Sequence, residues 1–142
     1  MRARYPDQEG FVQRDGVKVH YEVFGDGDPT VMLLPTWSIV HSRHWKAQVP
    51  YLSRYYRVVT FDGRGSGLSD RPTEPEAYAD DEYVADAIAV LDEVGVGQAV
   101  LGAFSRGGYY GVLFAAEHPE RTLGLFTIGA GVRLNAVENR PG

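Results

Sequence analysis

The sequence predicts an α/β protein with a mostly parallel, doubly wound sheet that begins with an antiparallel hairpin. Three observations support this fold class. Short continuous apolar runs, such as "TVMLLP" and "RVVTF", are typical of strands buried on both faces of a parallel sheet. Segments with helical spacing of apolar residues alternate with these runs, which indicates helices on both faces of the sheet. The dipeptide Asp15-Gly16 separates two segments rich in valine and aromatic residues, which is typical of a tight hairpin turn.

The strands follow in a simple order, with no internal repeat and no interdomain linker. The hairpin is expected over residues 10–25. Four buried strands are then expected over residues 30–35, 57–61, 98–103 and 122–130. Right-handed crossovers between such strands place the hairpin at one edge of the sheet and the 122–130 strand at the other. The final segment, residues 131–142, shows no clear period.

Three helices are predicted between the strands. The first is expected over residues 42–52, where Trp45 and Val49 share an apolar face. The second begins at Asp80, in an acidic first turn, and Gly95 suits its C-terminal cap. The third covers residues 106–118 and stops at Pro119, because the residue before a proline disfavours helical backbone.

Composition narrows the class of protein and of partner. The chain has 142 residues, which suits one domain, and 44% of them are hydrophobic. A net charge of −5 argues against nucleic acid as the main partner, and there are no cysteines for disulfides or thiolate metal sites. No apolar run approaches the ~20 residues of a membrane span, and no signal-peptide pattern follows the charged N-terminus. We therefore expect a cytoplasmic protein without membrane contact.

The segment "AFSRGG" places a serine where a buried strand passes directly into a helix. It is close to G-x-S-x-G, in which the serine occupies a strained turn and its neighbours must be small. Ala103, Gly107 and Gly108 meet that requirement. Ser105 is then a candidate nucleophile, and the Arg106 N–H a candidate donor to an oxyanion. The plainer interpretation of Ser105 is an ordinary helix N-cap.

A second motif, "FDGRGSGLSD", follows the 57–61 strand. Together with the serine turn and with "AAEHPER", it resembles the α/β-hydrolase superfamily over nearly the whole chain. The family turn D-x-R-G-x-G-x-S is matched by Asp62, Arg64, Gly65, Gly67 and Ser69. Its glycine spacing fits neither G-x-G-x-x-G nor a P-loop, so we rank phosphate binding low.

The resemblance implies that a second oxyanion-hole N–H comes from the residue that follows the two residues at the end of the first buried strand, which here would be Trp37. Many family members have His-Gly at this point, whereas this chain has Pro35-Thr36. "PTWS" also resembles haloalkane dehalogenases, but those need an aspartate at the position of Ser105. The departure at Pro35-Thr36 also favours a non-catalytic alternative. The Pro-Thr-Trp strand end resembles that of hydrolase-like domains attached to regulatory proteins.

A base for the serine is missing from the expected place. His118 lies at the far end of the helix that starts beside Ser105, and His20 falls in the hairpin. His41 and His44 precede the serine and are interpreted as exposed histidines at a helix start. With no cysteine and no acid at ligand spacing, we expect no metal site there, and no cofactor is implied.

We therefore expect residues 1–142 to be the N-terminal part of a single α/β-hydrolase-like domain, lacking its late strands, cap, acid and histidine. The predicted function is a serine hydrolase acting on a small ester-like substrate, and this chain alone should be almost inactive. A non-catalytic ligand-binding module and an inactive remnant remain alternatives. The 122–130 strand would lie at an uncovered sheet edge, where self-association is expected.

Overall fold

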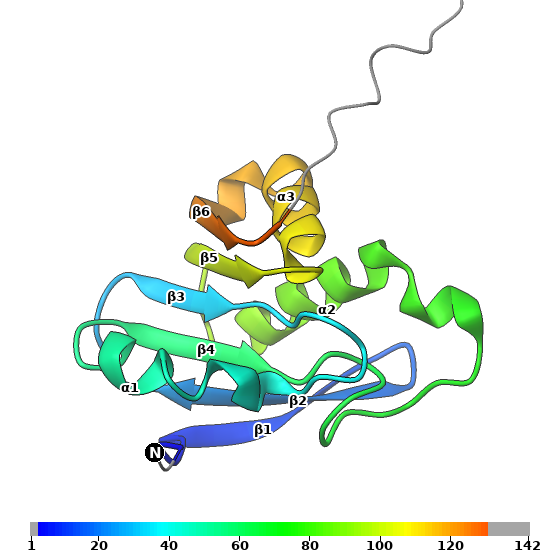
Figure 1. Ribbon diagram of the computed structural model, residues 1–142, viewed down its shortest axis with the longest axis horizontal. Helices are drawn as coiled ribbons and strands as arrows, with labels where there is room; N and C mark the ends of the chain where they lie inside the picture. Colours follow the sequence, from blue (N-terminus) through cyan, green and yellow to red (C-terminus); the bar gives the residue numbers. More distant parts are fainter. Residues whose placement is uncertain (1–2, 131–142) are drawn as a thin grey trace, which may run out of the picture.

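The computed structural model describes residues 3–130, which fold around one six-stranded sheet (Figure 1). The strands, in chain order, are β1 (Gln8–Arg14), β2 (Val17–Phe24), β3 (Thr30–Leu33), β4 (Arg57–Phe61), β5 (Ala99–Phe104) and β6 (Thr122–Ile128). In space their order is β1-β2-β4-β3-β5-β6. Strands β3 to β6 run parallel to one another. Strand β2 pairs antiparallel with β4, and β1 pairs antiparallel with β2. The predicted fold class, with the hairpin at one edge and β6 at the other, is confirmed.

The hairpin turn has the geometry that its sequence predicts. Asp15 has a φ of 50° and Gly16 a φ of 80°. Positive φ at both central residues defines the type I′ turn, whose twist matches that of the two strands. The register pairs Arg14 with Val17, so the loop contains only Asp15 and Gly16.

Helices cover both faces of the sheet, and each face has its own apolar core. Helices α2 (Asp80–Glu93) and α3 (Gly107–Glu117) pack on one face, while α1 (Val49–Leu52) lies on the other (Figure 1). The larger core, under α2 and α3, includes Met32, Leu101 and Phe114. The smaller core, under α1, is centred on Leu33 and Trp45.

The predicted helix over residues 42–52 is wrong as a continuous element. The structure has a 3₁₀ turn at Ser42–Trp45 and a separate short helix, α1. Trp45 and Val49 are buried as their spacing predicts. Pro50 explains the break, because it lacks the N–H that a continuous helix would bond to the Lys46 carbonyl, and proline is tolerated only in a first turn.

Two further sequence expectations concern the end of α2 and the last segment of the chain. Gly95, with a φ of 72°, follows the C-terminal cap of α2, as expected for a glycine in a left-handed conformation. The segment 131–142, for which the sequence shows no period, lies outside the described residues. Among residues 3–130, no helix is long and apolar enough to cross a membrane.

Candidate active site

Ser105 stands at the junction of β5 and α3 in an unusual backbone conformation. Its φ is 53°, and in the described part of the chain Asp15 is the only other non-glycine residue with positive φ. The Ser105 N–H donates to the Ile128 carbonyl at 2.9 Å, and the Ser105 carbonyl accepts from the Gly108 N–H at 2.9 Å. The surrounding hydrogen bonds hold a conformation that ordinary L-residues disfavour. The serine side chain is exposed beyond the carboxyl end of its strand.

Two glycines after Ser105 allow neighbouring segments to approach the turn. A Cβ on Gly107 would lie 2.3 Å from the Pro35 carbonyl oxygen, and one on Gly108 would lie 2.2 Å from the Ala130 Cβ. Neither distance is compatible with a side chain at these positions. The turn therefore packs directly against the segment that follows β3, where the sequence places Trp37.

Trp37 and Arg106 differ in how their side chains are held. The Trp37 side chain is 62% exposed, and its carbonyl accepts from the Val40 N–H at 2.9 Å. The Arg106 guanidinium pairs with Asp80 at 2.5 Å and lies 5.0 Å from the centroid of the Tyr109 ring. Within residues 3–130, neither the Trp37 nor the Arg106 backbone N–H has an intramolecular acceptor.

The loop after β4 is held by its own polar groups. The Asp62 carboxylate accepts from the Ser42 N–H at 2.9 Å and from the Leu68 N–H at 3.0 Å. A Cβ on Gly67, whose φ is 54°, would lie 2.2 Å from an Asp62 carboxylate oxygen. Ser69 donates from its hydroxyl to the Asp62 carbonyl at 2.6 Å. These contacts give the motif residues Asp62, Gly67 and Ser69 a structural role in holding the loop.

Arg64, in the same loop, forms a buried bidentate pair that sequence reasoning missed. Its guanidinium donates to both carboxylate oxygens of Asp86, at 2.8 and 2.9 Å. Asp86 is fully buried in α2 and also accepts from Arg14 at 2.9 Å. The aspartate interrupts the apolar face of its helix, and that interruption is the only signal by which the sequence could have shown it.

Asp62 has a pKa below its ordinary value. Burial alone would raise the pKa of this carboxyl, but the hydrogen bonds from Leu68 and Ser42 and the charge of His20 outweigh burial and lower it. An acid whose pKa is lowered by folding stabilises the fold above its unfolded pKa. That stabilisation is lost as the pH falls through the lower, folded value.

The Asp62→Asn variant should therefore show its destabilisation most clearly near neutral pH. We expect the difference in the free energy of unfolding between parent and variant to be largest at about pH 6 and to shrink towards about pH 3. Urea unfolding of both proteins across this range measures it. A difference that does not change with pH would show that the Asp62 charge adds nothing to stability.

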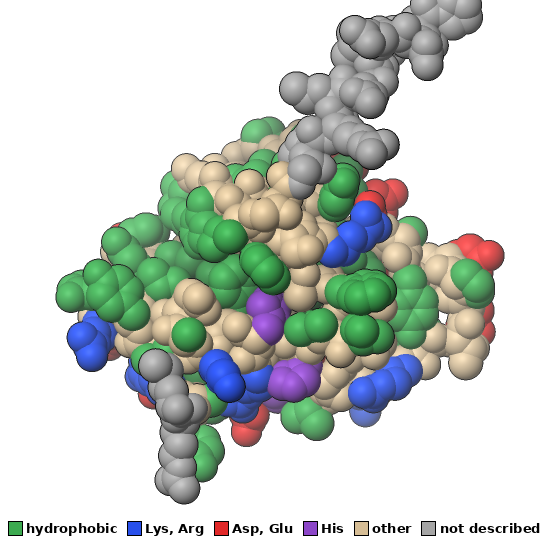
Figure 2. Space-filling view, in the orientation of Figure 1, with side chains coloured by type: hydrophobic (Ala, Val, Ile, Leu, Met, Phe, Trp, Pro, Cys, Tyr) green, Lys and Arg blue, Asp and Glu red, His purple; other side chains and the backbone are tan. Residues whose placement is uncertain are grey.

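The histidines do not form a pair with Ser105. His118 ends α3, at the opposite end of the helix from the serine, as the sequence predicts. His41 is exposed, and its Nδ1 accepts from the Arg43 N–H at 3.1 Å. No hydrogen bond joins a histidine to the Ser105 hydroxyl in the described part of the chain. Figure 2 shows histidine side chains on the face that carries α1, beside basic side chains.

The expectation of an exposed histidine is wrong for His44, which is half-buried. Its Nδ1 lies 3.0 Å from the His41 carbonyl oxygen and so carries the proton, leaving a lone pair on Nε2. Nε2 is buried without a partner among residues 3–130, and burial lowers the pKa of this imidazole. The ring lies 6.5 Å from that of Phe104, the residue before Ser105. Trp45, packed at 4.8 Å, holds it in place.

The strained serine lies between a strand and a helix, at the carboxyl end of a parallel strand. Ligands of α/β proteins bind at this edge of the sheet, so the turn is a candidate active site. The chain belongs to the alpha/beta hydrolase fold family, whose model matches residues 29–141.

Similar proteins include several hydrolases. The chain is 32% identical to 3-oxoadipate enol-lactonase 2 of Acinetobacter baylyi over 105 residues. These residues are 74% of this chain and 39% of the relative. It is 32% identical to epoxide hydrolase 4 of Mus musculus, over 82% of this chain and 33% of the relative. Among solved structures, epoxide hydrolase VrEH1 from Vigna radiata superposes with a TM-score of 0.83 at 29% identity, over 94% of this chain and 43% of that one. The chain thus spans between a third and a half of the length of these relatives.

Proposed function

We propose that the chain carries the nucleophile of a serine hydrolase that acts on small ester-like substrates by acyl transfer. The observation that carries this proposal is the positive φ of Ser105 between β5 and α3. In the mechanism, Ser105 Oγ attacks the substrate carbonyl carbon, and the Arg106 and Trp37 N–H groups stabilise the negative charge that develops on its oxygen. A histidine takes the serine proton and returns it to the leaving group.

The start of α3 suits a developing negative charge. The first amides of a helix have no partners within it and carry its positive dipole end. The contact between Gly107 and Pro35 brings the segment before Trp37 to the same turn. Serine is a weak nucleophile without a base, so the hydrolase also requires a histidine that hydrogen-bonds to Ser105.

That histidine, and the acid that orients it, are proposed to lie outside residues 1–142, which would form the N-terminal part of one hydrolase domain. The share of the relatives that the chain covers, 39% and 33% for the two named above, supports this division. Hydrolysis of p-nitrophenyl acetate tests the proposal, with Ser105→Ala as control, on the chain with and without any natural downstream sequence. A cytoplasmic location stays a prediction from the sequence.

A non-catalytic, ligand-binding domain is the second candidate. Pro35-Thr36 favours it, because proline and threonine stand where many hydrolases have His-Gly and a closer backbone approach. Assays of the chain extended by its natural downstream sequence distinguish the two functions. A binding domain would retain a lactone or ester without turnover, and its affinity would not depend on the Ser105 hydroxyl. An inactive remnant would do neither.

Self-association through β6 is a further part of the proposal. The outer edge of β6 has no neighbouring strand in the described residues, and Leu123, Phe126 and Ile128 are exposed along it. We expect the 142-residue chain to form dimers or larger species as its concentration rises. Leu123→Lys should reduce this association, because a charged side chain on an edge strand opposes strand pairing.

Sedimentation velocity at increasing concentration measures the effect. Tyr51→Lys is the matched control, since Tyr51 is 62% exposed on α1, away from this edge. A chain that stays monomeric at every concentration, or an equal response of the two variants, would contradict association through β6.

A further inference from the structure

A group of polar side chains crosses the hairpin side of the sheet, on the face that carries α1. Glu9 on β1 lies directly opposite Glu22 on β2, and Glu22 lies opposite Thr60 on β4. His20 is the next residue along β2 on the same face. One ligand atom from each of Glu9, His20 and Glu22 lies within 4.8 Å of the other two. We infer that these three residues bind a divalent transition-metal ion of the zinc class.

The negative charges around Glu9, His20 and Glu22 favour a bound cation. Like charges directly opposite each other on neighbouring strands destabilise a sheet. Glu22 is only 4% exposed, and one of its oxygens accepts from Arg43 at 2.8 Å. Asp62 adds a third carboxylate, and Arg43 is the one arginine or lysine that forms an ion pair with these three carboxylates among residues 3–130. Arg4 and Lys46 line the cavity beside Glu22 without pairing with it. When His20 is neutral, one divalent ion would balance the two carboxylates that have no ion pair with a lysine or arginine.

The two nitrogens of His20 have separate partners. Nδ1 lies 3.5 Å from an Asp62 carboxylate oxygen, and Nε2 lies 3.2 Å from a Glu9 carboxylate oxygen. In the structure Nε2 is within hydrogen-bond distance of Glu9, and the tautomer decides which nitrogen carries the proton. When the proton is on Nδ1, towards Asp62, the Nε2 lone pair is available, and a cation between Nε2 and Glu9 would bind both. A carboxylate on the second nitrogen is the common arrangement around a histidine that binds metal.

The dimensions fit a small metal ion after a modest movement. Zinc binds imidazole nitrogen and carboxylate oxygen at about 2.0–2.2 Å, so two of its tetrahedral ligands lie about 3.3–3.6 Å apart. Glu9 has a side chain that is 60% exposed, and its rotation can close the gap. An open cavity of about 310 Å³, lined by His20, Glu22 and Leu68, leaves room for a fourth, solvent ligand. One nitrogen with two carboxylates favours zinc-class ions over magnesium or calcium.

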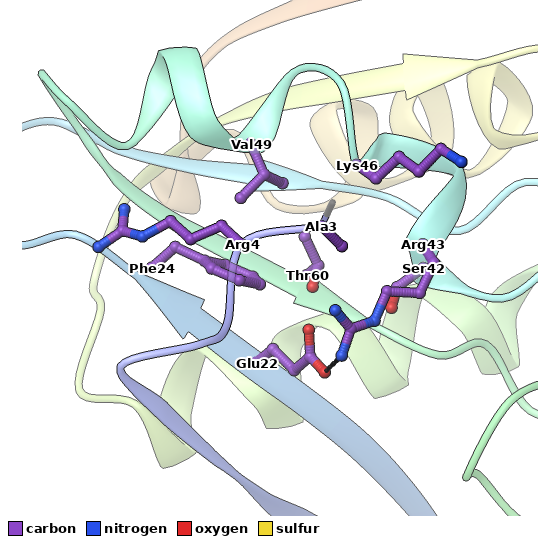
Figure 3. Close-up of a pocket in the computed structure, with 9 residues that line it drawn as sticks. All are labelled: Ala3, Arg4, Glu22, Phe24, Ser42, Arg43, Lys46, Val49 and Thr60. Atoms are coloured by element: carbon purple, nitrogen blue, oxygen red, sulfur yellow. Dashed lines mark hydrogen bonds and ion pairs between the residues drawn. The ribbon is translucent and has the colours of Figure 1, made fainter. Parts of the chain in front are cut away.

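Thr60 provides an independent sign of a polar occupant beside Glu22. Its hydroxyl is buried and has no hydrogen-bond partner among residues 3–130. Figure 3 shows the Thr60 oxygen pointing towards the Glu22 carboxylate, in a cavity of about 10 Å³ that would take a single water. Arg4 and Lys46 line this cavity without forming an ion pair with the described residues of the cluster. A water bonded to Thr60 and Glu22 would orient the carboxylate towards the metal.

Isothermal titration calorimetry with zinc chloride tests the site on the 142-residue chain. We expect a single equivalent of zinc to bind and to raise the melting temperature, because an ion that binds only the folded state stabilises it. Glu9→Gln should weaken binding by about tenfold or more, and its exposed position keeps the fold intact. His20→Gln should abolish binding, with circular dichroism as the check on its folding.

The controls are a His41→Gln, His44→Gln double variant, which removes the other nearby histidines, and Ser105→Ala. Both should bind zinc as the parent does, since neither contributes a ligand. Absence of binding by the parent would overturn the inference, as would equal affinity in Glu9→Gln or loss of binding in the double variant. Tighter binding of magnesium or calcium than of zinc would overturn the assignment to this class of metal.

Discussion

Hydrolysis of p-nitrophenyl acetate by the 142-residue chain is expected to be almost the same with and without the Ser105 hydroxyl. Among the described residues no histidine bonds to Ser105, so the hydroxyl stays protonated and weakly nucleophilic. In a chain extended by natural downstream sequence, Ser105→Ala should instead lower kcat by about a thousandfold or more. Removing a triad member leaves only what binding and the oxyanion hole provide.

Initial rates of the four proteins, at several substrate concentrations, give this comparison. Ser38→Ala is the matched control, because it removes a serine hydroxyl from a neighbouring loop and should leave kcat unchanged. Strong Ser105-dependent turnover by the 142-residue chain alone would contradict an external base. His44→Gln would then identify the group, since the His44 ring packs beside Phe104 and its Nε2 lone pair is unpartnered within residues 3–130.

Gly107→Val should cause the largest loss of stability. The added Cβ would lie 2.3 Å from the Pro35 carbonyl oxygen, which is part of the backbone and has no rotamer that relieves the contact. Either the start of α3 or the segment after β3 must move. We expect a loss of more than about 3 kcal/mol in the free energy of unfolding, above the usual range for overpacking.

Gly97→Val is the control for this variant. No atom lies within 4 Å of a Cβ at Gly97, and its φ is not positive, so the same chemical change meets open space. Urea unfolding of the two variants and the parent measures the difference. Equal stabilities of Gly107→Val and Gly97→Val would show that the turn after Ser105 has room for a side chain.

Local patterns predicted most of the fold because strands and helices differ in the spacing of their apolar residues and in the residues that end them. The apolar runs predicted β3 and β4, and Asp15-Gly16 predicted the hairpin turn. The prediction of one helix over residues 42–52 was wrong because two short turns satisfy the same apolar spacing. Pro50 excludes the continuous helix in favour of the two turns. Ser105 could be singled out because a serine with small neighbours between strand and helix is a local signal.

Contacts between distant segments could not be read from local patterns. Asp86 pairs with Arg64 and Arg14 only because the loop after β4 and the hairpin both reach α2. The approach of the His44 ring to Phe104 likewise joins two segments that lie far apart in the sequence. The Glu9–Glu22 pair is an exception, because the two-residue turn at Asp15-Gly16 fixes the register of β1 and β2 that places these residues opposite each other.

The position of β3 between β4 and β5 has a consequence for synthesis on the ribosome. β4 emerges soon after β3, but β5 emerges only after the whole of α2. Until then, one edge of the central strand is open, and closing it requires a long loop whose entropy slows folding. A nascent chain that ends within α2 therefore presents an apolar, unpaired strand at the middle of its future sheet, which is the kind of surface that chaperones bind.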